Sequence, residues 1–176
     1  LAQNRIDLMI GRLFPRHDTR NLQYEPLAEE NVCAIARPDH PLLAGGTPGL
    51  AELAKASWVV PPEGSVLRHR FELMFQNAGL QPPRQVIGTA ALVLVPRLLQ
   101  GSDHLAVVPV DVARHYAGYG MVKQLPVELS CRMDSFGFIT RTDWLLSPGA
   151  RTVLAALREA AQQVYAPAAK STRRGG

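Results

Sequence analysis

Residues 58–87, "WVVPPEGSVLRHRFELMFQNAGLQPPRQVI", contain two short apolar runs on either side of an amphipathic segment. One face of that segment carries Leu67, Phe71, Met74, Phe75 and Ala78. This spacing follows the 3.6-residue period of a helix and predicts one over residues 65–78, with Ser65 as its N-cap and Gly79 at the C′ position. The apolar runs at 58–60 and 85–87 predict buried strands. A strand, a helix and a strand in this order are the repeating unit of an α/β fold.

The start of this helix is a candidate anion site. Arg68 stands where a capping box would place Glu or Gln, so the helix's own side chains do not claim all of its first-turn N–H groups. Unclaimed N–H groups and the positive end of the helix dipole attract anions. Most helix starts are simply hydrated, so the helix alone is weak evidence for a ligand.

The same alternation continues along the chain. Further apolar runs predict strands at residues 6–10, 32–36, 105–108 and 136–140. Helical patterns fall at residues 50–55, 90–100, 110–116 and 148–165. The order of strands and helices predicts an α/β fold with mainly parallel strands.

Pro96 complicates the helix expected at residues 90–100, which has Thr89 as its N-cap and Gly101 at C′. A proline inside a helix removes a hydrogen bond and clashes with the preceding turn, at a cost of about 3 kcal/mol. Either the helix is kinked, or it starts late with Pro96 at its first position. We favour the kink, because residues 90–95 form an apolar helical lead-in.

The composition limits the class of protein. With 176 residues, 47% hydrophobic and 19% charged, the chain can bury a core as one domain or as two small lobes. The net charge of +4 falls close to zero without Lys170, Arg173 and Arg174, so charge does not indicate a nucleic-acid surface. The sequence has no apolar run of 18 residues, so we expect neither a membrane span nor a signal peptide in it.

The two cysteines, Cys33 and Cys131, lie in apolar, strand-like surroundings without metal-ligand spacing. This favours buried free thiols in a reducing cytoplasm, with a disulfide as the alternative.

No pattern for catalysis or for a cofactor stands out. Ser65 and His69 are about one helical turn apart, but the Gly-x-Ser-x-Gly elbow that exposes a nucleophilic serine is missing. His40 and His104 lack partners at metal-ligand spacing. The sequence has no Walker loop and no Gly-x-Gly-x-x-Gly. We therefore expect a protein that is not an enzyme and that holds no metal or cofactor.

Five segments in order resemble the effector-binding domain of LysR-type transcriptional regulators. They are "LAQNRIDLMIG", "YEPLAEENVCAIARPDHPL", "GLAELAKASWVVPPEGSVLRHRFELMFQNAGLQPP", "LVPRLLQGSDHLAVVPVDVA" and "FGFITRTDWLLSPGARTVLAAL". The resemblance covers essentially residues 1–165. The chain departs from the family in two ways. Many members have Gly-x-Gly where this chain has Ser102, Asp103 and His104, and the chain starts after the winged helix-turn-helix and the first strand–helix–strand of the family. The resemblance thus implies an N-terminally truncated domain.

The resemblance implies a periplasmic-binding-protein-like architecture of two α/β lobes joined by crossover strands. Lobe I would comprise residues 1–29 and 135–166 and would be incomplete, lobe II would comprise 30–134, and 167–176 would be a disordered tail. The incomplete sheet of lobe I should expose residues 6–10 and 136–140 as edges that recruit other chains.

The resemblance also implies a ligand cleft between the lobes. On that basis, and because ligands of open α/β sheets bind beyond the carboxyl ends of strands, we expect an effector to contact Ser65, Val66, Leu67, Arg12, Thr89, Pro109 and Val110. Arg12 is equally well interpreted as a solvated surface arginine, and Thr89 as a plain N-cap.

The leading interpretation is a cytoplasmic module that senses a small anionic metabolite and self-associates as a dimer or tetramer. It would contact DNA only through the helix-turn-helix missing from these residues, and it would not contact a membrane. One alternative is a solute-binding protein of the same fold that serves transport. Another is a ligand-dependent enzyme such as a deaminase or dehydratase.

Overall fold

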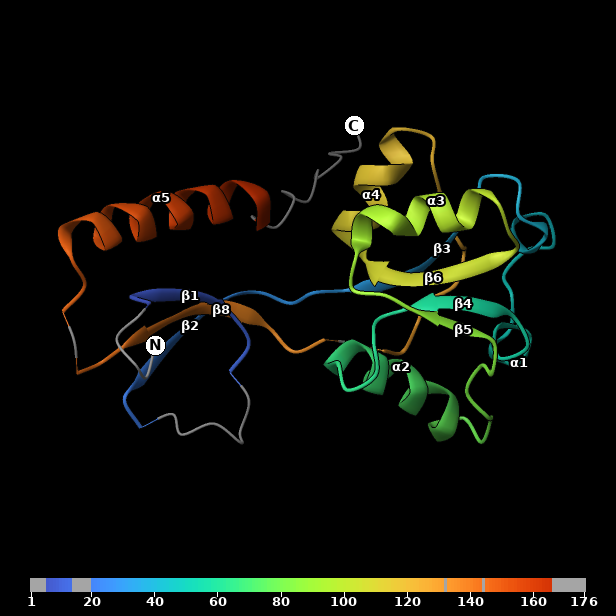
Figure 1. The fold of residues 1–176 in the computed structure, drawn as a ribbon, viewed down its shortest axis with the longest axis horizontal. Helices are drawn as coiled ribbons and strands as arrows, with labels where there is room; N and C mark the ends of the chain where they lie inside the picture. Colours follow the sequence, from blue (N-terminus) through green and yellow to red (C-terminus); the bar gives the residue numbers. More distant parts are fainter. Residues whose placement is uncertain (1–5, 14–19, 132, 144, 166–176) are drawn as a thin grey trace, which may run out of the picture. The chain divides into compact units, whose positions relative to one another are not determined.

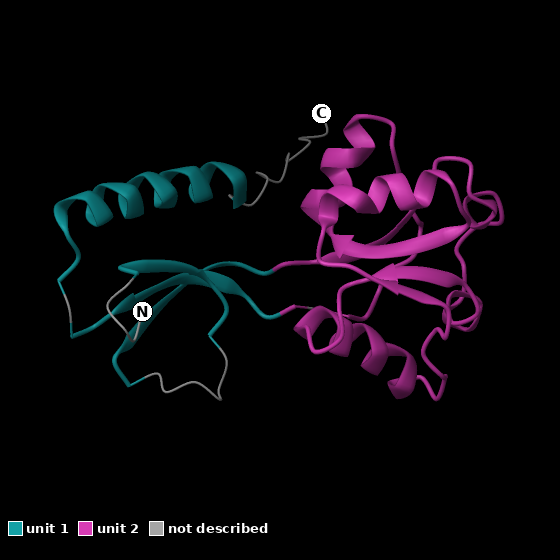
Figure 2. Cartoon of the chain, in the orientation of Figure 1, with its two compact units in different colours: residues 1–29, 134–176 teal, residues 30–133 magenta. Residues whose placement is uncertain are grey.

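The computed structural model describes residues 6–13, 20–131, 133–143 and 145–165. The chain divides into two compact units, drawn in different colours in Figure 2. Unit 1 comprises residues 1–29 and 134–176, and unit 2 comprises residues 30–133. These borders lie at, or one residue from, the lobe borders expected from the sequence. The tail expected at residues 167–176 lies outside the described residues.

Unit 2 is built on a five-stranded sheet with the order β5-β4-β6-β3-β7. Its strands are β3 (Val32–Ala36), β4 (Ser57–Val60), β5 (Val86–Gly88), β6 (His104–Pro109) and β7 (Lys123–Gln124). Strand β4 runs parallel to β5 and β6, whereas β3 runs antiparallel to β6 and β7. The sheet is therefore mixed rather than mainly parallel. A short apolar run marks a buried strand but carries no information on its direction.

Helices cover both faces of this sheet (Figure 1). The helix α2 (Val66–Asn77) packs on one face, where Phe71 makes edge-to-face contacts with Trp58 and Phe75 at centroid distances of 4.8 and 5.2 Å. The helices α3 (Val95–Gln100) and α4 (Val110–Gly118) pack on the other face. Two short helices, η1 (Pro41–Leu43) and α1 (Leu50–Leu53), lie between β3 and β4 in the chain.

The caps of α2 are those predicted from the sequence. Ser65 precedes the helix, and its Oγ accepts the Arg68 N–H at 3.3 Å. At the other end Gly79 has φ of +72°, in the left-handed region where glycine avoids a steric penalty. The N–H of Leu80 bonds to the Phe75 carbonyl, which completes the glycine-terminated end of the helix.

The segment around Pro96 contradicts the kinked helix that we favoured. A 3-10 turn, η2 (Leu92–Leu94), comes first, and α3 begins only at Val95 with Pro96 in its first turn. The alternative of a late start is therefore correct, because the missing N–H of a proline costs nothing in the first turn. Gly101 ends α3 with φ of −99° and does not adopt the left-handed conformation of a C′ glycine.

Unit 1 contains an antiparallel sheet with the order β1-β8-β2. Its strands are β1 (Leu8–Gly11), β2 (Leu22–Ala28) and β8 (Phe136–Arg141), and α5 (Pro148–Tyr165) lies along one face (Figure 1). The expected edge at residues 136–140 is wrong, because β8 is the central strand. Among the described strands β1 is an edge, as expected, and its Met9 and Ile10 are 45% and 48% exposed.

The two cysteines are free and buried, on opposite faces of the unit 2 sheet. Cys131 packs in the cluster beneath α2, and Cys33 packs in the cluster beneath α3 and α4. The disulfide alternative is therefore wrong. Burial raises the pKa of both thiols to about 11.

We expect neither cysteine to react with a disulfide thiol reagent in the native protein at pH 8. The thiolate is the reactive form, and both burial and the raised pKa suppress it. Absorbance of the released thiol should report two reactive groups in 6 M guanidinium chloride and almost none without it. Rapid reaction of either thiol in the native state would contradict this burial.

Candidate functional site

Three strands of unit 2 end at the same edge of the sheet. Because β4 is parallel to β5 and β6, their carboxyl ends share one side, which we call the carboxyl edge. The loop at residues 61–65 follows β4, Thr89 follows β5, and Val110 follows β6. This edge is where open α/β sheets hold ligands, and it brings together every predicted site residue of unit 2.

Ser65 holds the first turn of α2 in place. Its Oγ donates to the Pro62 carbonyl at 2.8 Å while accepting the Arg68 N–H. The helical hydrogen-bond ladder begins with His69 N–H to Ser65 O at 3.1 Å, so the N–H groups of Val66 and Leu67 lie outside it. Arg68 pairs with Glu72 on the same helix.

The loop before α2 lies close to the end of β5. A Cβ placed on Gly88 would be 3.9 Å from the Pro62 Cα, and the Thr89 N–H donates to the Val60 carbonyl at 2.9 Å. The Thr89 hydroxyl accepts the Ala91 N–H at 3.1 Å. Thr89 therefore closes a local hydroxyl turn and is not the N-cap of a helix.

The end of β6 leads directly into α4. Pro109 occupies the N-cap position, and the Val110 N–H donates to the Asn31 carbonyl at 2.9 Å. Val110 can therefore offer a ligand its side chain but not its amide. Asp111 adds a negative charge to this helix start, and it pairs with Arg114 at 2.8 Å.

Arg12, the predicted site residue of unit 1, directly follows β1 and is held against its own unit. Its Nε donates to the Asp134 carbonyl at 2.8 Å, and its guanidinium carbon lies 5.9 Å from the centroid of the Phe136 ring. Cation–π contact and a backbone hydrogen bond both restrain the side chain. These contacts tie the Arg12 side chain to its own unit and leave open whether it also meets a ligand.

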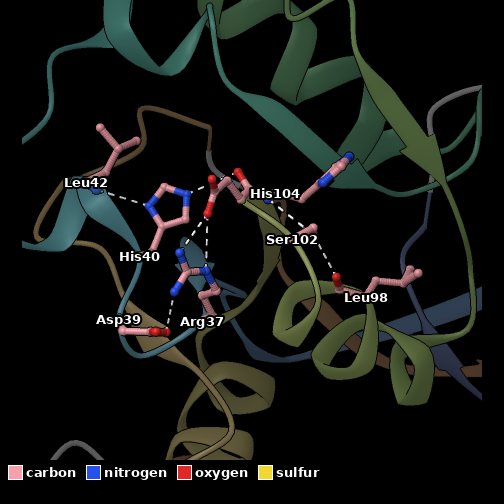
Figure 3. Close-up of polar contacts among 8 residues, drawn as sticks. Arg37, Asp39, His40, Leu42, Leu98, Ser102 and His104 are labelled. Carbon is pink, nitrogen blue, oxygen red and sulfur yellow. Dashed lines mark hydrogen bonds and ion pairs between the residues drawn. The ribbon is translucent and has the colours of Figure 1, made fainter.

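The opposite edge of the unit 2 sheet carries a polar network (Figure 3). Arg37, which follows β3, bonds to the Asp103 carboxylate at 2.8 Å and pairs with Asp39. These hydrogen bonds lower the pKa of both carboxyl groups. His40 is 5% exposed, and it accepts the Leu42 N–H at Nδ1 while its Nε2 lies 3.1 Å from the Asp103 carbonyl. With both ring nitrogens satisfied by backbone, His40 is a structural residue.

The hydrogen bonds of Ser102 explain how the chain forms the turn before β6, although it lacks the Gly-x-Gly expected there from the resemblance. The Ser102 Oγ donates to the Leu98 carbonyl at 2.7 Å and accepts the His104 N–H at 3.4 Å. Side chains thus supply the hydrogen bonds of the turn that leads into β6. The capping role of His40 was not predicted, although its position directly before a proline was a signal for it.

In unit 1 a cavity of about 420 Å³ lies between β2 and α5, and another of about 320 Å³ is lined by β2, β8 and α5. Glu25 and Arg158 line both, and their hydrogen bond and ion pair lower the pKa of Glu25. No predicted site residue lines them. Because Glu25 and Arg158 satisfy each other, neither is available to a charged ligand.

Within the described ranges, no group of three His, Cys, Asp or Glu side chains is arranged to hold a metal ion. Nor does any described helix combine the length and the hydropathy needed to cross a bilayer.

Comparison with known proteins found a matching protein family. Residues 1–162 match the family model of the LysR substrate binding domain. The HTH-type transcriptional regulator GbpR of Azospirillum brasilense is 36% identical over 161 residues, which cover 91% of this chain and 47% of that protein. GalR of Pseudomonas putida, another HTH-type regulator, is 32% identical over 154 residues, which cover 88% of this chain and 38% of that protein. The chain therefore spans about half or less of the length of these relatives.

Solved structures match the fold. The Synechocystis PCC6803 CcmR regulatory domain in complex with 2-PG has a TM-score of 0.71 and 17% identity, covering 92% of this chain and 76% of that one. The effector binding domain of QuiR in complex with shikimate has a TM-score of 0.69 and 15% identity, covering 93% and 75%. The expected periplasmic-binding-protein-like α/β fold is confirmed, with mixed sheets in place of mainly parallel ones.

Proposed function

This chain belongs to the LysR substrate binding domain family, and on that basis we propose that it senses a small organic acid for a bacterial transcriptional regulator. The arrangement of the carboxyl edge is the observation that carries the proposal. There the first turn of α2 presents the Val66 and Leu67 N–H groups, and the ends of β5 and β6 bring Thr89, Pro109 and Val110. The first turn of α2 favours an anion, since helix N-termini carry partial positive charge.

We propose that Arg12 binds the same ligand. A guanidinium forms paired hydrogen bonds with a carboxylate, which the neutral side chains of the carboxyl edge cannot do. The solved relatives support an organic acid, because QuiR is described in complex with shikimate, a carboxylate. Units 1 and 2 would thus be the two lobes of an effector-binding domain.

The mechanism would be a shift between conformations. A ligand changes such an equilibrium only as far as it binds one conformation better than the other. An acid that bonds to both units at once binds best in one arrangement, and it would alter in that way how attached DNA-binding parts engage DNA. Self-association, DNA contact through a further domain, and a place in the cytoplasm belong to the same proposal.

Family membership favours this function over the two alternatives. A transport protein of the same fold has no support among the relatives compared above, which are transcriptional regulators. An enzyme would need a base or nucleophile at the carboxyl edge. Ser65 and Thr89 instead use their hydroxyl groups in local hydrogen bonds with the backbone, so we propose no catalysis.

The proposal predicts saturable binding of an organic acid by the 176-residue chain. Isothermal titration calorimetry and thermal unfolding should be run with a panel of carboxylates that includes shikimate and 2-PG, with the methyl ester of shikimate as the neutral control. A ligand at 100 times its Kd should stabilise the protein by about 2.7 kcal/mol, and the ester should bind more weakly. A panel without any saturable binder, or an ester that binds as well as its acid, would contradict the proposal.

A further inference from the structure

The backbone of the carboxyl edge offers a ligand few hydrogen-bond donors. Prolines occupy residues 61, 62 and 109, where β4 and β6 end, and a proline has no N–H. The N–H groups of Thr89 and Val110 are already bonded to carbonyl groups of unit 2. Those of Val66 and Leu67 lie outside the hydrogen bonds of α2, and together they suit the oxygens of one carboxylate.

The side chains of this edge add little polarity. The hydrocarbon ones pack partly against the core clusters of unit 2, and they are Val66, Leu67 and Val110. The Ser65 hydroxyl donates its proton to a backbone carbonyl, whereas no described residue accepts the proton of the Thr89 hydroxyl. Glu63 and Asp111 are exposed carboxylates, which repel an acid group. A ligand with several hydroxyl groups would therefore leave some of them unpaired at this edge.

An exposed apolar turn follows the end of β5. Three consecutive large side chains of η2 are open to water, with Leu92 43%, Val93 73% and Leu94 52% exposed. The Thr89 hydroxyl accepts the Ala91 N–H, and the Leu94 N–H donates to the Ala91 carbonyl at 2.9 Å. These short-range bonds keep η2 beside the end of the strand. A run of exposed apolar side chains is unfavourable in water and marks a surface that binds something.

We propose that unit 2 selects an acid with an apolar body, which Leu92 and Val93 contact, over an acid of the same skeleton that carries several hydroxyl groups. This selectivity deepens the proposed function and rests on it, since the first turn of α2 would hold the acid group. Contact with η2 removes apolar surface from water on both sides. A hydroxyl group that enters without a partner loses its hydrogen bonds to water. Leu92 and Val93 are thus specificity-determining residues.

The test compares two acids built on the same ring. One is shikimate, and the other is the cyclohexenecarboxylate that keeps its double bond but lacks its hydroxyl groups. Isothermal titration calorimetry would give the ratio of the two dissociation constants for the parent, for Leu92→Asn and for Val93→Thr. Leu145→Asn is the matched control, because Leu145 is an apolar residue of unit 1 that is 89% exposed and lies outside the carboxyl edge.

We expect the parent to bind cyclohexenecarboxylate about tenfold more tightly than shikimate, the factor for one hydroxyl group left unpaired. Leu92→Asn and Val93→Thr should each reduce that preference by roughly threefold, because they replace apolar contact surface with a polar group. Leu145→Asn should keep the parental ratio. Should Leu92→Asn prove unfolded, Val93→Thr still tests the selectivity, because Val93 is mostly exposed.

Shikimate binding as tightly as cyclohexenecarboxylate would overturn the selectivity but leave the acid-binding function in place. An unchanged ratio in the η2 variants would overturn it as well. If those variants instead altered the sedimentation of the chain, the apolar turn would be a contact between two copies. Failure of the proposed function would look different, because then no carboxylate would bind the parent, and the selectivity would fail with it.

Discussion

Gly137→Ala should unfold or severely destabilise unit 1, the largest effect that we expect from any single substitution. A Cβ at residue 137 would lie 2.1 Å from the Glu25 carbonyl oxygen and 2.8 Å from the Pro26 Cα. Real Cβ atoms do not approach backbone this closely, and β8 cannot retreat because β1 holds its other side. The β2 backbone is irregular there, with a register shift between Pro26 and Ala28. Overpacking against backbone should cost about 3 kcal/mol or more.

Chemical denaturation and amide exchange would measure this effect. The amide hydrogens of β8 should lose their protection from exchange, while those of the core strands β3, β4 and β6 of unit 2 should keep theirs. Gly149→Ala is the matched control, since a Cβ there meets nothing within 4 Å and α5 should tolerate or prefer alanine. A Gly137→Ala protein as stable as the parent would show that β2 and β8 do not pack as described.

Arg12→Ala should weaken organic-acid binding by about 30-fold, equivalent to roughly 2 kcal/mol for a lost charge-assisted hydrogen bond. Calorimetry with the tightest acid of the panel would measure it. The affinity of Arg12→Lys should lie between those of the parent and Arg12→Ala, because a lysine keeps the charge but loses the paired geometry. Arg97→Ala, which removes an exposed arginine of α3, is the control for net charge.

Arg12→Ala would also remove the hydrogen bond to the Asp134 carbonyl, so its effect on binding needs a comparison. Tyr24→Phe removes the neighbouring hydrogen bond, from the Tyr24 hydroxyl to the Ser135 carbonyl, without touching a proposed ligand contact. If the two variants weakened binding equally, Arg12 would act only by holding the backbone of Asp134 and Ser135 in place. Ser65→Ala is less informative, because Ser65 caps α2 and its loss would itself cost about 1 kcal/mol of stability.

Local chemistry explains which parts of the fold were predictable. The strand, helix and strand around α2 were predicted because period, N-cap and C′ glycine all agree. Strand β2 was missed, since Glu25 and Pro26 interrupt its apolar pattern and proline argues against a strand interior. Strand β7 has only two residues, both exposed, and so carries no pattern at all.

The candidate site was predictable only in part for a related reason. Strand ends and helix starts place Ser65, Thr89 and Val110, but their meeting at one edge depends on the sheet order β5-β4-β6. The hydrogen bonds of Arg12 to the Asp134 carbonyl and of Tyr24 to the Ser135 carbonyl join residues 122 and 111 positions apart. One sequence contains no periodicity that reports such contacts, so only the structure could reveal them.

Amide exchange with and without a saturating organic acid tests the central claim most directly, because it locates the ligand without a substitution. We predict slower exchange at residues 61–67, 88–91 and 109–112, the three segments of the carboxyl edge, and at residues 133–136, where Arg12 bonds to the Asp134 carbonyl. Protection confined to residues 37–43 and 101–104 at the opposite edge, or to the grooves beneath α5, would contradict the proposed effector site.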